Sequence, residues 1–186
     1  MVALKNISEG IPKSIIDELK GYIRDVPDFP KPGIVFKDFT PLIENARAFS
    51  TTVDLFAKRY RDQGIDKVVA VESRGFIIGS PLAYAIQAGC VIVRKPGKLP
   101  FKKDQVDYQL EYGKDRLEMH HGAIQKGEKC LIIDDLLATG GTVGAVKQLV
   151  ERQGGNIFEA AFIIELSFLK GREKLQGITT HSLIQY

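Results

Sequence analysis

The sequence predicts an α/β fold with a central, mainly parallel sheet flanked by helices. Short apolar runs alternate with helix-like segments along most of the chain, and each run is continuous rather than interrupted by polar residues. Continuous runs are typical of parallel strands that are buried on both faces. The chain has 186 residues, of which 44% are hydrophobic and 26% charged, the balance of one soluble globular domain. We therefore expect a single domain over residues 1–186.

The first third of the chain is expected to hold two helices separated by a proline-rich loop. Apolar side chains recur at helical spacing over residues 12–26, which predicts an amphipathic helix. Residues 27–41 contain four prolines, so we expect an ordered loop there with a short extended piece at 34–36. A second helix is predicted after Asn45, whose side chain can cap it, and Gly64 can end it.

The remainder of the chain follows a strand–helix–strand order. Strands are predicted at 68–71, 91–93, 131–133 and 160–164, with helices at 76–87 and 142–153. In such sheets, ligands bind beyond the carboxyl ends of the strands. A long, charged stretch at 95–114 interrupts the order, and we expect a mobile loop with some hairpin character there.

Composition argues against several classes of partner. The net charge of +3 provides no broad basic face, so nucleic acid is not an expected partner. The N-terminus lacks the apolar core of a signal peptide, and the apolar runs are too short to cross a bilayer, so no membrane association is expected. Cys90 and Cys130 each lie in an apolar run, where buried, reduced thiols and a cytoplasmic location are expected.

The most informative segment is residues 131–142, where two acids and a loop of small residues follow a buried strand and open a helix. Backbone N–H groups, hydroxyls and glycines at a helix N-terminus can hold a phosphate. The adjacent carboxylates of Asp134 and Asp135 can accept hydrogen bonds from neighbouring hydroxyls and favour developing positive charge. This pattern suits a ribose phosphate that reacts at its anomeric carbon. The candidate phosphate-binding residues are Ala138, Thr139, Gly140, Gly141 and Thr142.

A structural interpretation of the same segment stays open, in which the acids merely start a helix and the glycines form a plain turn. Other phosphate motifs fit less well, because the chain has neither GxxxxGK[ST] nor GxGxxG after a strand. The three histidines lack metal-ligand spacing, so we expect structural roles for them.

Cations follow two other predicted strands. Arg74 lies in the turn after the strand at 68–71, and a guanidinium can hold a pyrophosphate through two parallel hydrogen bonds. Arg94, Lys95 and Lys98 follow the strand at 91–93. The alternatives are a surface arginine in a tight turn and a solvated charged edge.

Residues 131–142 resemble the phosphoribosyl pyrophosphate signature of type I phosphoribosyltransferases. The likeness extends over nearly the whole chain and is closest to the members that act on adenine. The other similar segments are residues 27–30, 32–38, 72–76, 94–100, 110–113 and 169–175. The resemblance implies the type I phosphoribosyltransferase fold, with a small hood at about 27–41 and a mobile catalytic loop at about 95–114.

The resemblance also implies an activity, namely transfer of the 5-phosphoribosyl group from phosphoribosyl pyrophosphate to adenine, which gives AMP and pyrophosphate. Its implied cofactor is Mg²⁺, bound through substrate oxygens and water, and its implied assembly is a homodimer. Two alternatives stay open. One is transfer to hypoxanthine, guanine or xanthine, and the other is a non-catalytic protein that senses or binds phosphoribosyl pyrophosphate.

Site roles follow from the resemblance residue by residue. Glu111 is implied as the general acid or base in the mobile loop beside Tyr112, and Arg74 as the second catalytic residue. Asp134 and Asp135 are implied to bind the ribose. The implied pyrophosphate-binding residues are Glu72, Ser73, Arg74, Arg94 and Lys98, with a non-prolyl cis peptide between Glu72 and Ser73 and with Arg94 reaching the neighbouring subunit. The implied base-binding residues are Val35, Phe36, Lys37 and Leu166.

Two positions depart from the family pattern. Pro96 stands where a basic residue is frequent, and Lys37 stands where arginine is common. One pyrophosphate contact and a bidentate contact at residue 37 are therefore in question.

Overall fold

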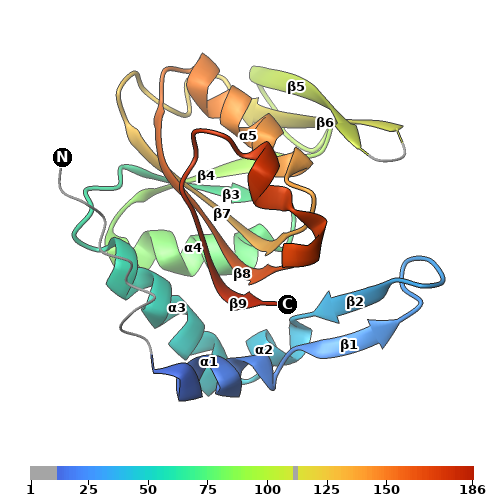
Figure 1. Cartoon of the computed structure of the whole chain (residues 1–186). Helices are drawn as coiled ribbons and strands as arrows, with labels where there is room; N and C mark the ends of the chain where they lie inside the picture. The colour runs from blue at the N-terminus through green and yellow to red at the C-terminus, as the bar shows by residue number, and fades with distance from the viewer. Residues whose placement is uncertain (1–11, 111–112) are drawn as a thin grey trace. The chain divides into compact units, whose positions relative to one another are not determined.

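The computed structural model describes residues 12–110 and 113–186 (Figure 1). The chain divides into two compact units, Met1–Arg59 and Tyr60–Tyr186. The expectation of one domain over all 186 residues stays a prediction.

The first unit contains a β-hairpin and helical segments. Its elements are α1 (Lys13–Lys20), β1 (Arg24–Pro27), β2 (Val35–Asp38), α2 (Thr40–Glu44) and nearly all of α3 (Ala46–Tyr60). Strands β1 and β2 pair antiparallel, with Arg24 opposite Asp38, and these two side chains form an ion pair of 2.6 Å. The Ala48 N–H donates to Asn45 Oδ1 at 3.0 Å, which confirms the predicted helix cap.

The predicted first helix was too long. Helix α1 ends at Lys20, and residues 24–27 form strand β1 instead of a further helical turn. Two physical reasons account for the difference. Val26 precedes a proline, which disfavours the helical conformation, and the backbone of β1 gains hydrogen-bond partners on β2.

The second unit is built on a mixed sheet. Within its described part, seven strands pair in the order β5-β6-β4-β3-β7-β8-β9. The strands from β4 to β9 along this order run parallel, while β5 and β6 form an antiparallel hairpin at one edge. The prediction of a mainly parallel sheet is therefore confirmed. The strands are β3 (Lys67–Val71), β4 (Gly89–Arg94), β5 (Lys103–Leu110), β6 (Gly113–His120), β7 (Lys129–Leu137), β8 (Asn156–Glu165) and β9 (Thr180–Gln185).

Helices α4 (Gly75–Ile86) and α5 (Gly141–Arg152) cover opposite faces of this sheet (Figure 1). Side chains alternate between the faces along each strand. Val69 and Ile132 lie in a core cluster that includes apolar residues of α5. Ala70 lies on the other face, so close to α4 that a Cβ at Gly79 would be 2.6 Å from the Ala70 Cβ. Burial on both faces explains why these strands are apolar throughout.

The topology determines where a ligand can bind. Strand β3 leads through α4 to β4 on one side of it, whereas the adjacent β7 leads through α5 to β8 on the other side. The two connections diverge at the carboxyl ends of β3 and β7. Parallel α/β sheets bind ligands in the crevice at such a switch point.

Two further expectations are corrected or refined. The stretch predicted as a loop forms the β5–β6 hairpin, whose described pairing runs from Lys103–His120 to Leu110–Gly113. Cys130 is buried as expected. Cys90 is exposed instead, because it lies at the start of β4, before the buried part of that strand.

Among the helices of the described residues, none has the length and apolar character that crossing a bilayer requires.

Candidate active site

A cavity of about 260 Å³ lies at the carboxyl ends of β3 and β7, where the topology places a ligand site. Six of the residues predicted from sequence line it together, and they come from two separate stretches of the chain, residues 72–74 and 134–142. These are Glu72, Arg74, Asp134, Asp135, Ala138 and Thr142, and the cavity is completed by Lys95, Tyr108, Leu117 and Leu136.

Two successive carboxylates of β7 form the floor of the candidate site. Asp135 is only 4% exposed and its Oδ2 lies 2.9 Å from Arg74 Nε, while its N–H donates to Asp134 Oδ1 at 2.9 Å. Burial, together with the neighbouring charge of Asp135, raises the pKa of Asp134 well above its usual value. The pair therefore disfavours two full negative charges and favours hydrogen-bonding partners that are neutral or cationic.

Strand β7 does not end at Ile133 as predicted but continues through both acids to Leu137. The continuation is stabilised by pairing with β8, in which Asp134 lies opposite Phe162 and Leu137 opposite Glu165. The acids therefore belong to a strand and precede helix α5 by several residues. The interpretation of them as helix-start acids was wrong.

The small-residue loop lies between β7 and α5. Gly140 has a φ of +80°, in the left-handed region that favours glycine, and its carbonyl accepts the first helical hydrogen bond from Gly144 N–H at 3.0 Å. The N–H groups of the first helical turn precede any acceptor within the helix, and the helix dipole is positive at this end. Both properties suit the loop to hold an anion.

The turn after β3 contains the predicted cis peptide between Glu72 and Ser73, so that prediction is confirmed. The Glu72 carboxylate accepts hydrogen bonds from Lys95 N–H (2.7 Å) and from the Arg94 guanidinium (3.2 and 3.3 Å). Burial acts to raise the pKa of Glu72, but these bonds outweigh it and leave the pKa below its usual value. Glu72 therefore orients cations at the cavity edge.

Arg94 and Lys98 do not line the cavity, although Arg94 binds Glu72, which does. Besides Glu72, the Arg94 guanidinium binds the Lys98 carbonyl at 2.9 Å, and neither residue is among those that line the cavity. Ser73 is exposed in the turn before α4. The pyrophosphate roles of these residues and the reach of Arg94 to a second subunit stay predictions.

Sequence reasoning did not assign Tyr108 to the site, and it named Lys95 only as one of three cations that follow the strand at 91–93. The Lys95 ammonium pairs with Asp115, and the Tyr108 hydroxyl lies 3.1 Å from the same carboxylate and is also hydrogen-bonded to Thr142 in the phosphate loop. The sequence did contain an indication of this position of Tyr108. Tyr108 lies two residues after the buried Val106, and residues two apart in a strand lie on the same face. The hairpin is thus joined to the candidate phosphate loop.

The candidate base-binding residues are divided between the two units. In the first, the Phe36 ring contacts the Phe29 ring edge-on at 5.2 Å, and Lys37 Nζ forms an ion pair of 2.6 Å with Asp25. Val35 is exposed, whereas Leu166 of the second unit is buried directly after β8. A shared base site formed by these residues stays a prediction. Glu111 and Tyr112 lie outside the described residues.

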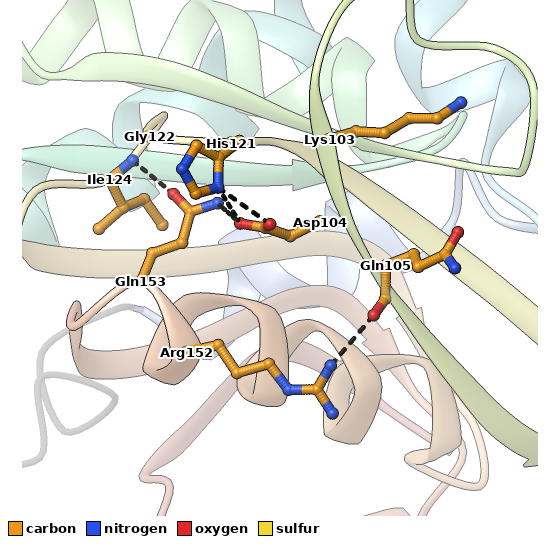
Figure 2. Close-up of a pocket in the computed structure, with 8 residues that line it drawn as sticks. All are labelled: Lys103, Asp104, Gln105, His121, Gly122, Ile124, Arg152 and Gln153. Carbon is orange, nitrogen blue, oxygen red and sulfur yellow. Dashed lines mark hydrogen bonds and ion pairs between the residues drawn. The ribbon is translucent and has the colours of Figure 1, made fainter.

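A second pocket, of about 740 Å³, contains none of the predicted site residues (Figure 2). It lies between the β5–β6 hairpin and the end of α5. Its polar groups bind one another, as in the Gln153 amide, which contacts Asp104, the His120 carbonyl and the Ile124 N–H. Because these groups already have partners, we do not regard this pocket as the active site.

Comparison with known proteins identifies the family. Residues 43–176 match the phosphoribosyl transferase domain family. The chain belongs to the phosphoribosyltransferase family. The prediction made from residues 131–142 is thereby confirmed, together with the type I phosphoribosyltransferase fold.

Similar members of the phosphoribosyltransferase family carry one specific name. The adenine phosphoribosyltransferase of Geobacter metallireducens is 57% identical over 92% of this chain and 100% of its own length. The crystal structure of the Thermoanaerobacter pseudethanolicus adenine phosphoribosyltransferase is 48% identical, with a TM-score of 0.89 over 92% of this chain and 99% of that one. The Saccharomyces cerevisiae adenine phosphoribosyltransferase, complexed with an imino-altritol bisphosphate and adenine, is 39% identical, with a TM-score of 0.87 over 92% and 99%.

Proposed function

We propose that this chain transfers the 5-phosphoribosyl group from phosphoribosyl pyrophosphate to adenine, with AMP and pyrophosphate as products. The observation that carries the proposal is the cavity at the switch point, where the paired aspartates of β7, the phosphate loop and Arg74 meet. Relatives named for this activity match more than nine-tenths of the chain at above 50% identity.

Each part of the cavity has a role in the proposed reaction. Residues 138–142 hold the 5′-phosphate, and Asp134 and Asp135 accept hydrogen bonds from the ribose hydroxyls. Arg74 stabilises the departing pyrophosphate, aided by Glu72, Ser73, Arg94 and Lys98 at the edge. The anomeric carbon then passes through an oxocarbenium-like state, which the nearby carboxylates stabilise. Catalysis is largely a matter of position and electrostatics.

The base is selected by the hood and the end of β8. Phe36 and Leu166 cover the two faces of the purine, and Val35 backbone groups bind its edge, with Lys37 beside them. Adenine presents an amino donor beside a ring acceptor, whereas a 6-oxopurine presents the reverse, so the wrong base leaves polar groups unpaired. Glu111 exchanges the proton at N7 within the loop that also carries Tyr112. The adenine bound in the complex of the yeast relative supports this choice of base.

Mg²⁺ is part of the proposal. Among residues 12–110 and 113–186, no cluster of three or more His, Cys, Asp and Glu side chains is arranged to hold a metal ion. We propose that the ion would be held by the oxygens of pyrophosphate, ribose and water, beside Asp134 and Asp135. When bound, Mg²⁺ neutralises charge on the pyrophosphate.

We also propose a homodimer in the cytoplasm. Helix α4 carries no charged residue, and its outer face carries Ile77 and Tyr84, the latter 88% exposed. A helix of this kind is usually covered by another element or subunit. Cys90 and Cys130 are free thiols, as is usual in a reducing compartment.

The test is to incubate the protein with Mg²⁺, phosphoribosyl pyrophosphate and an equimolar mixture of adenine, hypoxanthine, guanine and xanthine. We expect AMP as the main nucleotide. IMP, GMP or XMP in excess would contradict the base assignment. Binding of phosphoribosyl pyrophosphate without any nucleotide formed would favour the non-catalytic alternative.

A further inference from the structure

We propose that Arg172 is a positioning residue for the 5′-phosphate loop, which it supports from behind through its ion pair with Glu165. The inference rests on the proposed function, because it assigns the loop at 138–142 to the 5′-phosphate. Arg172 lies in the short 3₁₀ helix η3 (Gly171–Lys174), which follows β8 and a first 3₁₀ helix, η2 (Ser167–Leu169).

The phosphate loop packs backbone to backbone against the start of η3. A Cβ at Gly171 would lie 2.2 Å from the Ala138 carbonyl oxygen, and a Cβ at Gly140 would lie 2.6 Å from the Gly171 carbonyl oxygen. Real Cβ atoms do not approach other atoms this closely, so both positions require glycine. Leu175 adds its side chain to the same contact, 3.5 Å from the Cβ position at Gly140. The loop therefore rests on η3, and its location depends on where η3 is held.

Arg172 holds η3 to the sheet. Its Nε lies 2.6 Å from Glu165 Oε1 and its Nη2 lies 2.5 Å from Glu165 Oε2, while Nη1 donates to the Thr180 carbonyl at 3.1 Å. One guanidinium thus joins η3 to the end of β8 and the start of β9. Glu165 is only 5% exposed, and the bonds from Arg172 lower its pKa, so the carboxylate is charged and paired.

Glu165, the partner of Arg172, lies beside the point at which the chain enters the phosphate loop. Glu165 lies opposite Leu137, the last residue of β7 before the loop, and the Leu166 N–H donates to the Leu137 carbonyl at 2.9 Å. The ion pair therefore connects η3, on which the loop rests, with the end of β8, which pairs with β7 at the residue before the loop. Leu166 has its own backbone hydrogen bond to β7. We therefore expect binding of the base to depend less on Arg172 than binding of the 5′-phosphate does.

The decisive variant is R172K. Lysine keeps the positive charge but cannot form two parallel bonds to a carboxylate, so a change in binding reports lost geometry rather than lost attraction. We expect the KM for phosphoribosyl pyrophosphate, and its Kd by calorimetry, to rise about 10- to 100-fold, as small misplacements of binding groups do. The KM for adenine should change about twofold or less.

Two further variants separate positioning from stability. E165Q removes the charge of the other partner in the pair. It should likewise raise the KM for phosphoribosyl pyrophosphate and leave the KM for adenine nearly unchanged. K174A removes an exposed charge from the same short helix and should behave as the wild type. Circular dichroism and thermal unfolding would verify that each variant is folded before its constants are compared.

The inference is overturned if folded R172K binds phosphoribosyl pyrophosphate as the wild type does, or if both KM values rise equally. Failure of the proposed function gives a different result. If the wild type binds phosphoribosyl pyrophosphate but forms no AMP, the activity is wrong, while the Kd of R172K still judges the role of Arg172. If the wild type binds no phosphoribosyl pyrophosphate, both are wrong.

Discussion

The Arg74 guanidinium lies 2.9 Å from the buried Asp135 carboxylate, measured from Nε to Oδ2. The residue proposed to bind pyrophosphate is thus paired with a residue proposed to bind the ribose. The pair joins two residues that both line the cavity.

Replacement of Arg74 by alanine should reduce kcat/KM by about 10²–10³-fold, the typical cost of one lost donor to developing negative charge. R74K should recover only part of the loss, because lysine keeps the charge without the bidentate geometry. Steady-state AMP formation measures the effect. Arg61→Ala, at an exposed position outside the cavity, is the matched control and should retain activity. Full activity in R74A would remove Arg74 from the mechanism.

Asp134 should make the stability of the protein depend on pH. Burial and the charge of Asp135 raise its pKa, so the native state binds this proton more tightly than the unfolded chain does. Stability from this group is therefore complete below the unfolded pKa of about 3.9 and declines as the pH rises toward the folded pKa. Asparagine does not titrate, so D134N should be more stable than the wild type at pH 7 but not at pH 4.

Urea unfolding at several pH values between 4 and 8 measures this difference. The expected gain at neutral pH is about 1.4 kcal/mol for each unit by which the pKa is raised. Asp62→Asn, at an exposed position, should show no such trend. A gain in D134N that is the same at every pH would refute the assignment.

Gly140 and Gly144 offer a matched pair of glycines at the start of α5. In G140A, the Cβ would meet the Gly171 carbonyl oxygen at 2.6 Å and the φ of +80° would be strained, so the loop must move. We expect the KM for phosphoribosyl pyrophosphate to rise about tenfold or more. In G144A, the Cβ meets nothing within 4 Å, and a helical alanine should stabilise by about 0.5–1 kcal/mol. Equal effects in the two variants would contradict this account.

Gln153 should contribute to stability without a role in the reaction. Its amide binds the Asp104 carboxylate at 2.7 Å and the Ile124 N–H at 3.0 Å (Figure 2). It also donates to the His120 carbonyl at 2.9 Å. Alanine would leave these groups without that partner, at a cost of about 1–3 kcal/mol in unfolding free energy. Gln105→Ala, which removes only a 3.5 Å contact to Arg116, is the control. A Q153A variant of wild-type stability but reduced kcat would show that this pocket serves catalysis.

The sequence by itself determined the fold class and most of the cavity, because both are encoded in short, contiguous patterns. Continuous apolar runs indicated strands covered on both faces, and the acids and small residues of 134–142 indicated a phosphate site at the end of one of them. The turn with Arg74 could be placed at the same rim because parallel strands end at one edge. The cis peptide at Glu72–Ser73 followed from the family resemblance.

Only the tertiary structure decided which distant residues meet. Strand β1 was not predicted, because the spacing of its apolar residues continues that of helix α1. Only its pairing with β2 shows that it is a strand. The contacts of Tyr108 with Thr142 and of Arg172 with Glu165 depend on strand order and on the packing of η3, which local periodicity does not specify. Gly171 illustrates the reason. Glycine is required there because a Cβ would collide with the Ala138 carbonyl, which is close in space but more than thirty residues away in the chain.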